Sequence, residues 1–155
     1  MNGKSLAKLY RFNMAVIDEN LAGFTDQDAM FQPEPLGNCA NWILGHIIAN
    51  RNTIMKLVGE NPIWNGEESH PYRRGSEPLT DDTSAIPLDR MLTDLRASQE
   101  KLSSILTKMS AKQLEAIVED VTLYDYLGAL QFHEAYHAGQ LGILRRLIGK
   151  PGAIK

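Results

Sequence analysis

Two histidines flank a glutamate in a short run of this chain. Residues 132–141 read F-H-E-A-Y-H-A-G-Q-L and contain the H-E-x-x-H pattern of many zinc peptidases. Each residue of an α-helix advances by about 100°, so His137 lies about 40° from His133, one turn further along the same face. Two imidazoles at this spacing can bind one metal ion. The motif therefore predicts a metal site on a helix.

A third histidine has an equivalent position on another predicted helix. His46 lies at the centre of an apolar stripe, after Trp42 and before Ile54. A lone inward-facing histidine is usually a satisfied core residue, but every buried imidazole needs a hydrogen-bond partner or a metal. Because no acidic residue shares these stripes, we favour one metal ion bound by His46, His133 and His137.

The H-E-x-x-H pattern also matches metallopeptidases, in which the glutamate is the general base. Glu134 lies about 60° from His137 around the helix, so its side chain could reach a water at the site. Those enzymes also need a third ligand, commonly downstream, and a strand to hold the peptide. No His, Asp or Glu follows His137, and no strand is predicted. We therefore do not expect a peptidase, and Glu134 is only a weak catalytic candidate.

Three neutral imidazoles would leave the full positive charge on a divalent ion. Such a site with an open position acidifies a bound water or thiol and generates a nucleophile near neutral pH. We expect zinc or nickel, and iron, cobalt and manganese are also compatible with imidazole ligands.

Four other polar residues are candidates for the surroundings of the ion. Gln140 and Asn50 each follow one of the histidines by about one helical turn, where they could orient a ligand or a water. Asn13 and Tyr126 are weaker candidates for lining the pocket. Each of the four could equally be a packed side chain that hydrogen-bonds within the core.

Four segments with helical periodicity must position these residues. Apolar residues recur at helical spacing over about residues 5–22, 38–58, 87–109 and 123–148. Asn38 is suited to cap the second helix, and Pro87 to the first position of the third. Ser98 and Gln99 interrupt the apolar run of the third helix near its middle. A short helical turn is predicted after Thr25.

Four amphipathic helices predict an all-α fold, and a four-helix bundle is the simplest architecture for them. The length of 155 residues suits one domain, residues 1–155, with a core of its own. We expect neither strands nor internal repeats.

The connection between the second and third helices is unusually long. Residues 61–86 are rich in proline, glycine and charge, which is typical of a lid, a crossover or a surface loop. Its length would let the third helix run in the same direction as the second. Aromatic and cationic residues that could cover a site or bind an anionic ligand are Trp64, Tyr72, Arg73 and Arg74. His70 is interpreted as a surface residue or an occasional extra ligand.

The composition narrows the possible partners. The net charge of −3 and the pI near 5.8 give no basic footprint for nucleic acid. No stretch approaches the roughly 18 apolar residues of a membrane span, and no signal peptide is recognisable. The single cysteine, Cys39, excludes an intramolecular disulfide and a cysteine-based zinc site. We expect a cytoplasmic protein with a small-molecule substrate.

Three motifs together resemble a known family. Residues 42–46 read W-I-L-G-H, residues 133–141 read H-E-A-Y-H-A-G-Q-L, and residues 144–150 read L-R-R-L-I-G-K. This combination is similar to the DinB/YfiT-like superfamily of metalloenzymes, and the similarity extends over nearly the whole chain. The resemblance implies a four-helix bundle, often a homodimer, in which His46, His133 and His137 bind the metal. It gives Glu134 no role in catalysis, because many relatives carry other residues there.

The resemblance also implies a class of chemistry. Some members are similar to thiol-dependent S-transferases that use bacillithiol, mycothiol or glutathione, and others to isomerases of the maleylpyruvate type. We therefore expect a metal-dependent enzyme that activates a low-molecular-weight thiol or water, with thiol transfer favoured over hydrolysis. The alternatives are a metal-dependent hydrolase and a non-catalytic protein in which the metal only holds the helices together. An open coordination position that faces a pocket would distinguish an enzyme from a non-catalytic metal-binding protein.

Overall fold

The computed structural model describes residues 2–34, 37–80 and 84–154, and helices dominate within them. The elements in chain order are α1 (Gly3–Leu21), α2 (Asp26–Ala29), α3 (Ala40–Leu57), α4 (Gly66–Ser69), the 3₁₀ turn η1 (His70–Tyr72), α5 (Leu88–Lys108), α6 (Ala111–Leu114), β1 (Ile117–Val118), β2 (Val121–Thr122) and α7 (Leu123–Leu147). The prediction of an all-α fold is confirmed.

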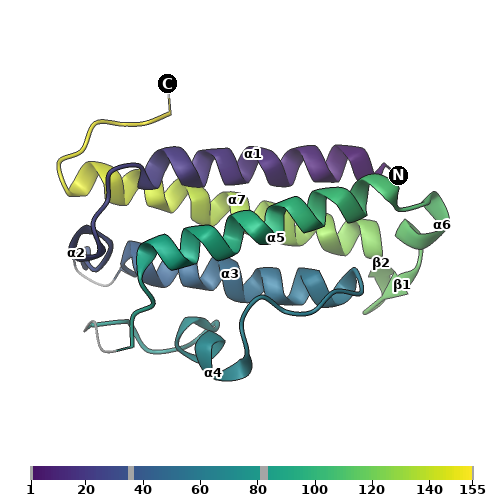
Figure 1. Cartoon of the computed structure of the whole chain (residues 1–155), viewed down its shortest axis with the longest axis horizontal. Coiled ribbons are helices and arrows are strands. Elements are labelled where there is room, and N and C mark those ends of the chain that lie inside the picture. Colours follow the sequence, from purple (N-terminus) through teal and green to yellow (C-terminus); the bar gives the residue numbers. More distant parts are fainter. Residues whose placement is uncertain (1, 35–36, 81–83, 155) are drawn as a thin grey trace.

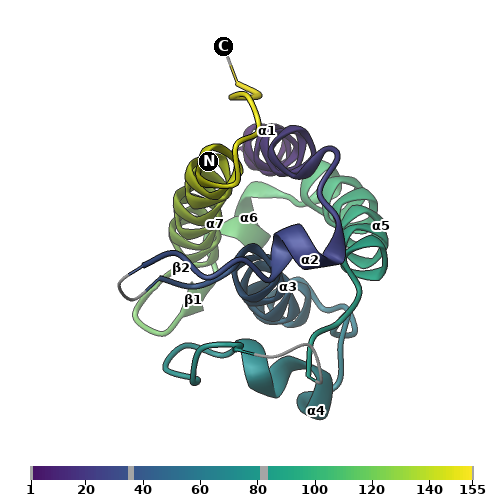
Figure 2. The ribbon, with the colours of Figure 1, turned by 90° about the vertical axis from the view of Figure 1, so that its left-hand side faces the viewer.

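The four long helices, α1, α3, α5 and α7, lie side by side (Figure 1). Viewed from the end, α1 and α3 each pack against both α5 and α7 (Figure 2). The helices α3 and α5 run in one direction and α1 and α7 in the other. The long connection between α3 and α5 returns along the outside of α3, which allows these two helices to be parallel.

The core has two apolar parts with a polar layer between them. One apolar part contains the second half of α1 and the first half of α3, and the other contains the first turns of α1 and the end of α3. Fully buried aliphatic side chains such as Leu6 and Ile17 each contribute about 1.5–3 kcal/mol to folding. Between the two parts lie the buried polar side chains Asn13, Arg51, Gln99 and Glu134.

Two helix starts differ from the sequence prediction by one residue. Cys39, and not Asn38, caps α3, because its Sγ accepts a hydrogen bond from the backbone N–H of Trp42 at 3.4 Å. Pro87 is the cap of α5 with an extended ψ of 137°, and the first helical residue is Leu88. The predicted helical turn after Thr25 is present as α2, and Thr25 caps it.

The expectation of no strands was wrong at one point. The strands β1 and β2 form a two-residue antiparallel hairpin in which Val118 pairs with Val121. The turn residues Glu119 and Asp120 both have positive φ, 48° and 67°, as a type I′ turn requires. The strands are too short for an alternating pattern, and the turn lacks the Asn-Gly signal of such hairpins.

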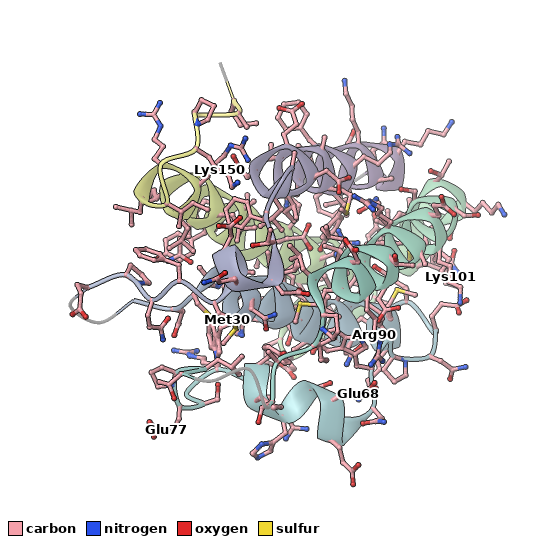
Figure 3. The ribbon with its side chains drawn as sticks, turned by 60° about the vertical axis from the view of Figure 1, so that its left-hand side comes forward. Met30, Glu68, Glu77, Arg90, Lys101 and Lys150 are labelled. Atoms are coloured by element: carbon pink, nitrogen blue, oxygen red, sulfur yellow. The ribbon has the colours of Figure 1, made fainter. Side chains whose placement is uncertain are left out.

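The long connection is packed against α3 and α5. Trp64 and Tyr72 are buried, and the Trp64 indole donates a hydrogen bond to Asp94 of α5 at 2.8 Å. Glu68 on α4 forms an ion pair with Arg90 on α5, and both side chains are labelled in Figure 3. These contacts hold most of the connection to the helices. Its residues 81–83 lie outside the part of the chain that the structure describes.

Among the described residues, no helix is both long enough and apolar enough to cross a membrane.

Candidate metal centre

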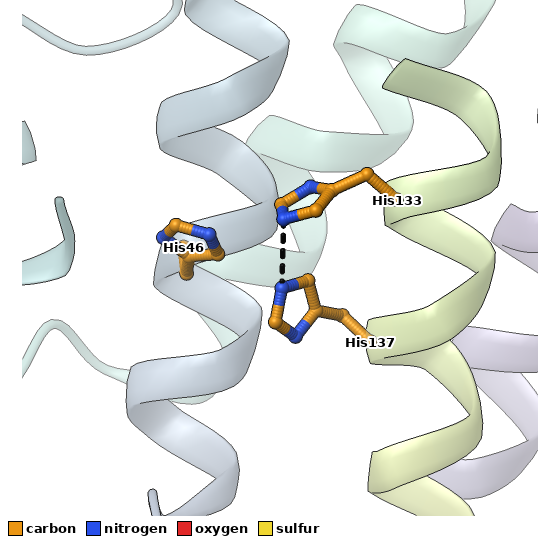
Figure 4. Close-up of side chains that lie close together, drawn as sticks. All are labelled: His46, His133 and His137. Carbon is orange, nitrogen blue, oxygen red and sulfur yellow. Dashed lines mark hydrogen bonds between the residues drawn. The ribbon is translucent and has the colours of Figure 1, made fainter. Parts of the chain in front are cut away.

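Three histidines from two helices meet between α3 and α7. His46 comes from α3, and His133 and His137 come from α7 (Figure 4). The ring centroids are 4.5–5.3 Å apart, and one nitrogen of each ring lies within 4.8 Å of the other two. His46 and His137 are buried, and His133 is partly exposed. The structure thus brings together residues that are far apart in the sequence.

Hydrogen bonds to the other ring nitrogens fix the orientation of two of these rings. Nδ1 of His46 lies 2.7 Å from the backbone oxygen of Tyr72, and Nδ1 of His137 lies 2.7 Å from Oε1 of Gln140. Because carbonyl oxygens only accept, both Nδ1 atoms carry the proton and donate it. The Nε2 atoms of His46 and His137 therefore carry free lone pairs, which is the state that binds a metal.

The spacing of the two α7 histidines suits a shared ion. Their Nε2 atoms are 3.2 Å apart (Figure 4). Two nitrogens bound to one zinc ion at 2.0–2.1 Å with a tetrahedral angle lie about 3.3 Å from each other. Since Nε2 of His137 carries a lone pair, this short approach needs either a proton from His133 or a cation between the rings. The donor set fits a divalent metal ion.

The electrostatic surroundings keep the imidazoles neutral. Burial lowers the pKa of His137 to about 4, although the hydrogen bond that its Nδ1 donates to Gln140 opposes this shift and the neighbouring imidazoles add to it. Burial also lowers the pKa of His46 and His133, and the positive charge of Arg74 adds to the effect at both. Neutral imidazoles are the form that ligates metals, so no deprotonation is needed near pH 7.

Comparison with known families agrees with this site. A family model described as the DinB superfamily matches residues 10–141. The chain belongs to the DinB superfamily. The matched region extends from α1 to α7 and includes all three histidines. The family resemblance seen in the sequence is thereby confirmed. No curated protein matches the chain.

Aromatic side chains support the histidines in this DinB chain. The ring of Trp42 stacks on His46 with centroids 4.8 Å apart and an interplanar angle of 8°. Tyr136 packs edge-on against His137, and its hydroxyl accepts a hydrogen bond from the Gln140 amide at 3.3 Å. Gln140 thus contacts His137 directly, as the helical spacing suggested. The stacked indole restricts rotation of the His46 ring.

Glu134 points away from the histidines and into the polar layer of the core. Its two carboxylate oxygens accept hydrogen bonds from Nε and Nη2 of Arg51 at 2.5 and 2.9 Å. Arg51 is fully buried and Glu134 is 3% exposed. An acidic side chain therefore does face the core beside the histidines, contrary to the expectation from the sequence. A carboxylate held by a buried guanidinium in this way is not available as a base at the metal centre.

The polar layer continues on both sides of this ion pair. Nη2 of Arg51 also donates to Gln99 at 2.7 Å, and its guanidinium lies 4.7 Å from the centre of the Tyr10 ring. Asn13 donates to Oε1 of Glu134 at 3.2 Å. Asn13 thus belongs to the polar layer and contacts the ion pair.

The remaining two candidates lie apart from the rings. Asn50 donates its amide hydrogen to the backbone oxygen of His46 at 2.9 Å and faces a cavity beside that residue. Tyr126 lies near the start of α7, where its hydroxyl interacts with Glu119 of the hairpin turn. The sequence missed Arg51 and Trp42 as supporting residues. Arg51 follows Leu44 and Ile47 at helical spacing, and this placement of a charge on a core stripe was the available signal.

Proposed function

We propose that this DinB superfamily chain is a metal-dependent enzyme in which His46, His133 and His137 bind one divalent ion, zinc or nickel. The observation that carries the proposal is the convergence of the three rings, two of which direct an Nε2 lone pair inward while Nδ1 is engaged elsewhere. Such hydrogen bonds to the far nitrogen are typical of histidines that bind metals.

We further propose thiol S-transferase-like chemistry with a low-molecular-weight thiol as co-substrate. A divalent ion bound by three neutral imidazoles supplies a Lewis acid that lowers the pKa of a thiol or water. The partial exposure of His133 and the cavity beside His46 support access for small molecules. Since Glu134 is bound to Arg51, the chain offers no evident base for hydrolysis at this position. Thiol transfer does not require such a base once the thiol is ionised.

Two alternatives make different use of the same residues. A metal-dependent hydrolase would act on water in place of a thiol. A non-catalytic protein would use the ion only to hold α3 and α7 together. The partly exposed face of His133 favours the enzyme, because an ion that only holds helices together is typically enclosed by four protein ligands.

Elemental analysis of protein purified without a histidine tag tests the metal centre. The wild type is expected to contain close to one ion per chain, and a His133→Ala plus His137→Ala variant to contain none. His70→Ala is the matched control, because this exposed histidine of η1 lies outside the cluster. Equal metal content in the wild type and the double variant would sink the proposal.

A panel of thiols and electrophiles tests the chemistry. Metal-loaded protein is expected to accelerate consumption of the electrophile only with some thiols, and the double histidine variant to show no acceleration. Ester or amide hydrolysis without any thiol requirement would instead support the hydrolase.

We also propose a cytoplasmic homodimer. Support for a dimer comes from large apolar side chains that are exposed on the adjacent helices α1 and α7, namely Leu9, Phe12, Phe132, Tyr136, Ile143 and Leu147. Several large apolar side chains exposed on two neighbouring helices are typical of protein interfaces. The single, buried Cys39 suits a reducing compartment.

A further inference from the structure

A cavity of about 370 Å³ lies between α3 and the long connection, with His46 in its wall. Residues 46–56 of α3 form one side, and residues 62–74 of the connection form the other. This volume is near the lower end of the range for small-molecule sites, which is about 300–1,000 Å³. The cavity is thus large enough for part of a small substrate and adjoins the metal centre.

All charged groups at this cavity are cationic. Lys56, Arg73 and Arg74 line it, and none of the described residues in its lining is Asp or Glu. Guanidinium groups bind carboxylates and phosphates through paired N–H donors, and lysine contributes a point charge. Three neighbouring cations repel one another, so an anion in the cavity would be stabilised by all of them.

Arg74 connects this charge to the metal centre. Arg74, from the connection, and His46, from α3, both line this one cavity. An anion bound by Arg74 would therefore lie beside the histidine cluster.

The neutral part of the wall is rigid. Asn52 is buried, and its Nδ2 donates to the Trp64 carbonyl at 3.0 Å and to Oγ of Ser69 at 2.9 Å. Its Oδ1 accepts hydrogen bonds from the backbone N–H groups of Ile63 and Trp64. These bonds fix the connection to α3 before any ligand arrives. A preformed wall lowers the entropy lost on binding.

We infer that this cavity binds the anionic group, a carboxylate or a phosphate, of the small molecule that reacts at the histidine cluster. The inference rests on the proposed function and adds a substrate class to it. The cationic side chains hold the anionic end, and the rest of the molecule extends past His46 toward the other two histidines. A neutral molecule of the same size lacks the interaction with Arg73, Arg74 and Lys56.

Titration of the metal-free protein with simple anions tests the cavity by itself. Succinate and inorganic phosphate are added in separate experiments at constant ionic strength, and uncharged succinamide is the comparison. The side-chain amide signals of Asn50 and Asn52, followed by ¹H–¹⁵N NMR, report on the cavity. We expect saturable shifts with succinate or phosphate and none with succinamide. The two anion arms show whether a carboxylate or a phosphate is preferred.

Variants assign the binding to the arginines. The Arg73→Gln plus Arg74→Gln variant is expected to bind the preferred anion at least about tenfold more weakly, since a hydrogen bond to a charged group contributes about 1.5–3 kcal/mol. The control Arg11→Gln removes one positive charge at an exposed position of α1, which lies on the far side of the molecule from α4 (Figure 2), and this variant should bind normally. Equal affinity for succinamide, or an equal loss in Arg11→Gln, would overturn the inference.

Metal content separates this inference from the proposed function. The double arginine variant is expected to contain as much metal as the wild type, because neither arginine is a ligand. Metal uptake by the wild type without selective anion binding contradicts the cavity inference alone. Selective anion binding by a wild type that takes up no metal refutes the proposed metal centre and leaves the anion site in place.

Discussion

Removal of Arg51 should destabilise the protein strongly. In Arg51→Met the aliphatic part of the side chain is kept, but the Glu134 carboxylate loses two of its three hydrogen bonds and its counter-charge. Glu134 is only 3% exposed, so water cannot replace the guanidinium without opening the core. Breaking a buried ion pair from one side costs about 3–5 kcal/mol. The total stability of a domain is about 5–15 kcal/mol.

Urea unfolding followed by far-UV circular dichroism at pH 7 measures the effect. The expected loss corresponds to a lower melting temperature by roughly 6–20 °C for a domain of this size. The double variant Arg51→Met plus Glu134→Leu is expected to lose much less than the sum of the two single variants, because no uncompensated charge stays buried. Gln99 would still lack the hydrogen bond from Arg51, and Asn13 the one to Glu134, so full recovery is not expected.

Two outcomes would refute this reasoning. A loss below about 1 kcal/mol in Arg51→Met would show that the carboxylate finds water or another partner. Additive losses in the double variant would show that the two side chains are not coupled. Glu134→Gln provides a separate check on function, because it should keep its metal content while it loses stability. A variant that folds but loses the ion would instead make Glu134 part of the metal centre.

Three further predictions follow from other contacts. Gly45→Ala should lower the free energy of unfolding in urea by about 1–3 kcal/mol and weaken metal binding, because a Cβ there would lie 2.2 Å from the buried ring of Tyr72, whose carbonyl orients His46. An unchanged free energy of unfolding would contradict this. Burial raises the pKa of the Cys39 thiol, so DTNB should react with it far more slowly in the native protein than in urea, and equal rates would show that the thiol is accessible. Light scattering should give a dimer mass for the wild type and a monomer mass for Phe12→Lys plus Phe132→Lys, whereas a monomeric wild type would contradict the proposed interface.

The positions of the long helices and the grouping of the three histidines could be predicted from the sequence. Helical periodicity located all four long helices to within about two residues, because each has a continuous apolar face. The same periodicity placed His46, His133 and His137 on inward faces, and these faces do meet. The helix starts were less accurate, since a cysteine thiol caps α3 where the sequence suggested the stronger cap Asn38.

The polar layer could be predicted only in part. The sequence showed that Ser98 and Gln99 interrupt the apolar face of α5, but one helix cannot indicate which groups on its neighbours face that point. The partner of a buried charge depends on helix rotation and on the level at which two helices meet. For this reason Glu134 was considered with the metal, when its side chain in fact points to Arg51 on the core side of α7. The hairpin was not predicted because strands of two residues are too short to show an alternation of apolar and polar residues.

The three histidines of the proposed metal centre lie far apart in the chain, and this affects the order of assembly. His46 is synthesised well before α7, so only an incomplete site exists while the chain is being made. An ion bound by these histidines would acquire its third ligand only after α7 has docked antiparallel to α3 over the polar layer. Partly folded chains therefore lack the complete set of three imidazoles, and metal occupancy would report that α7, the last long helix, has docked.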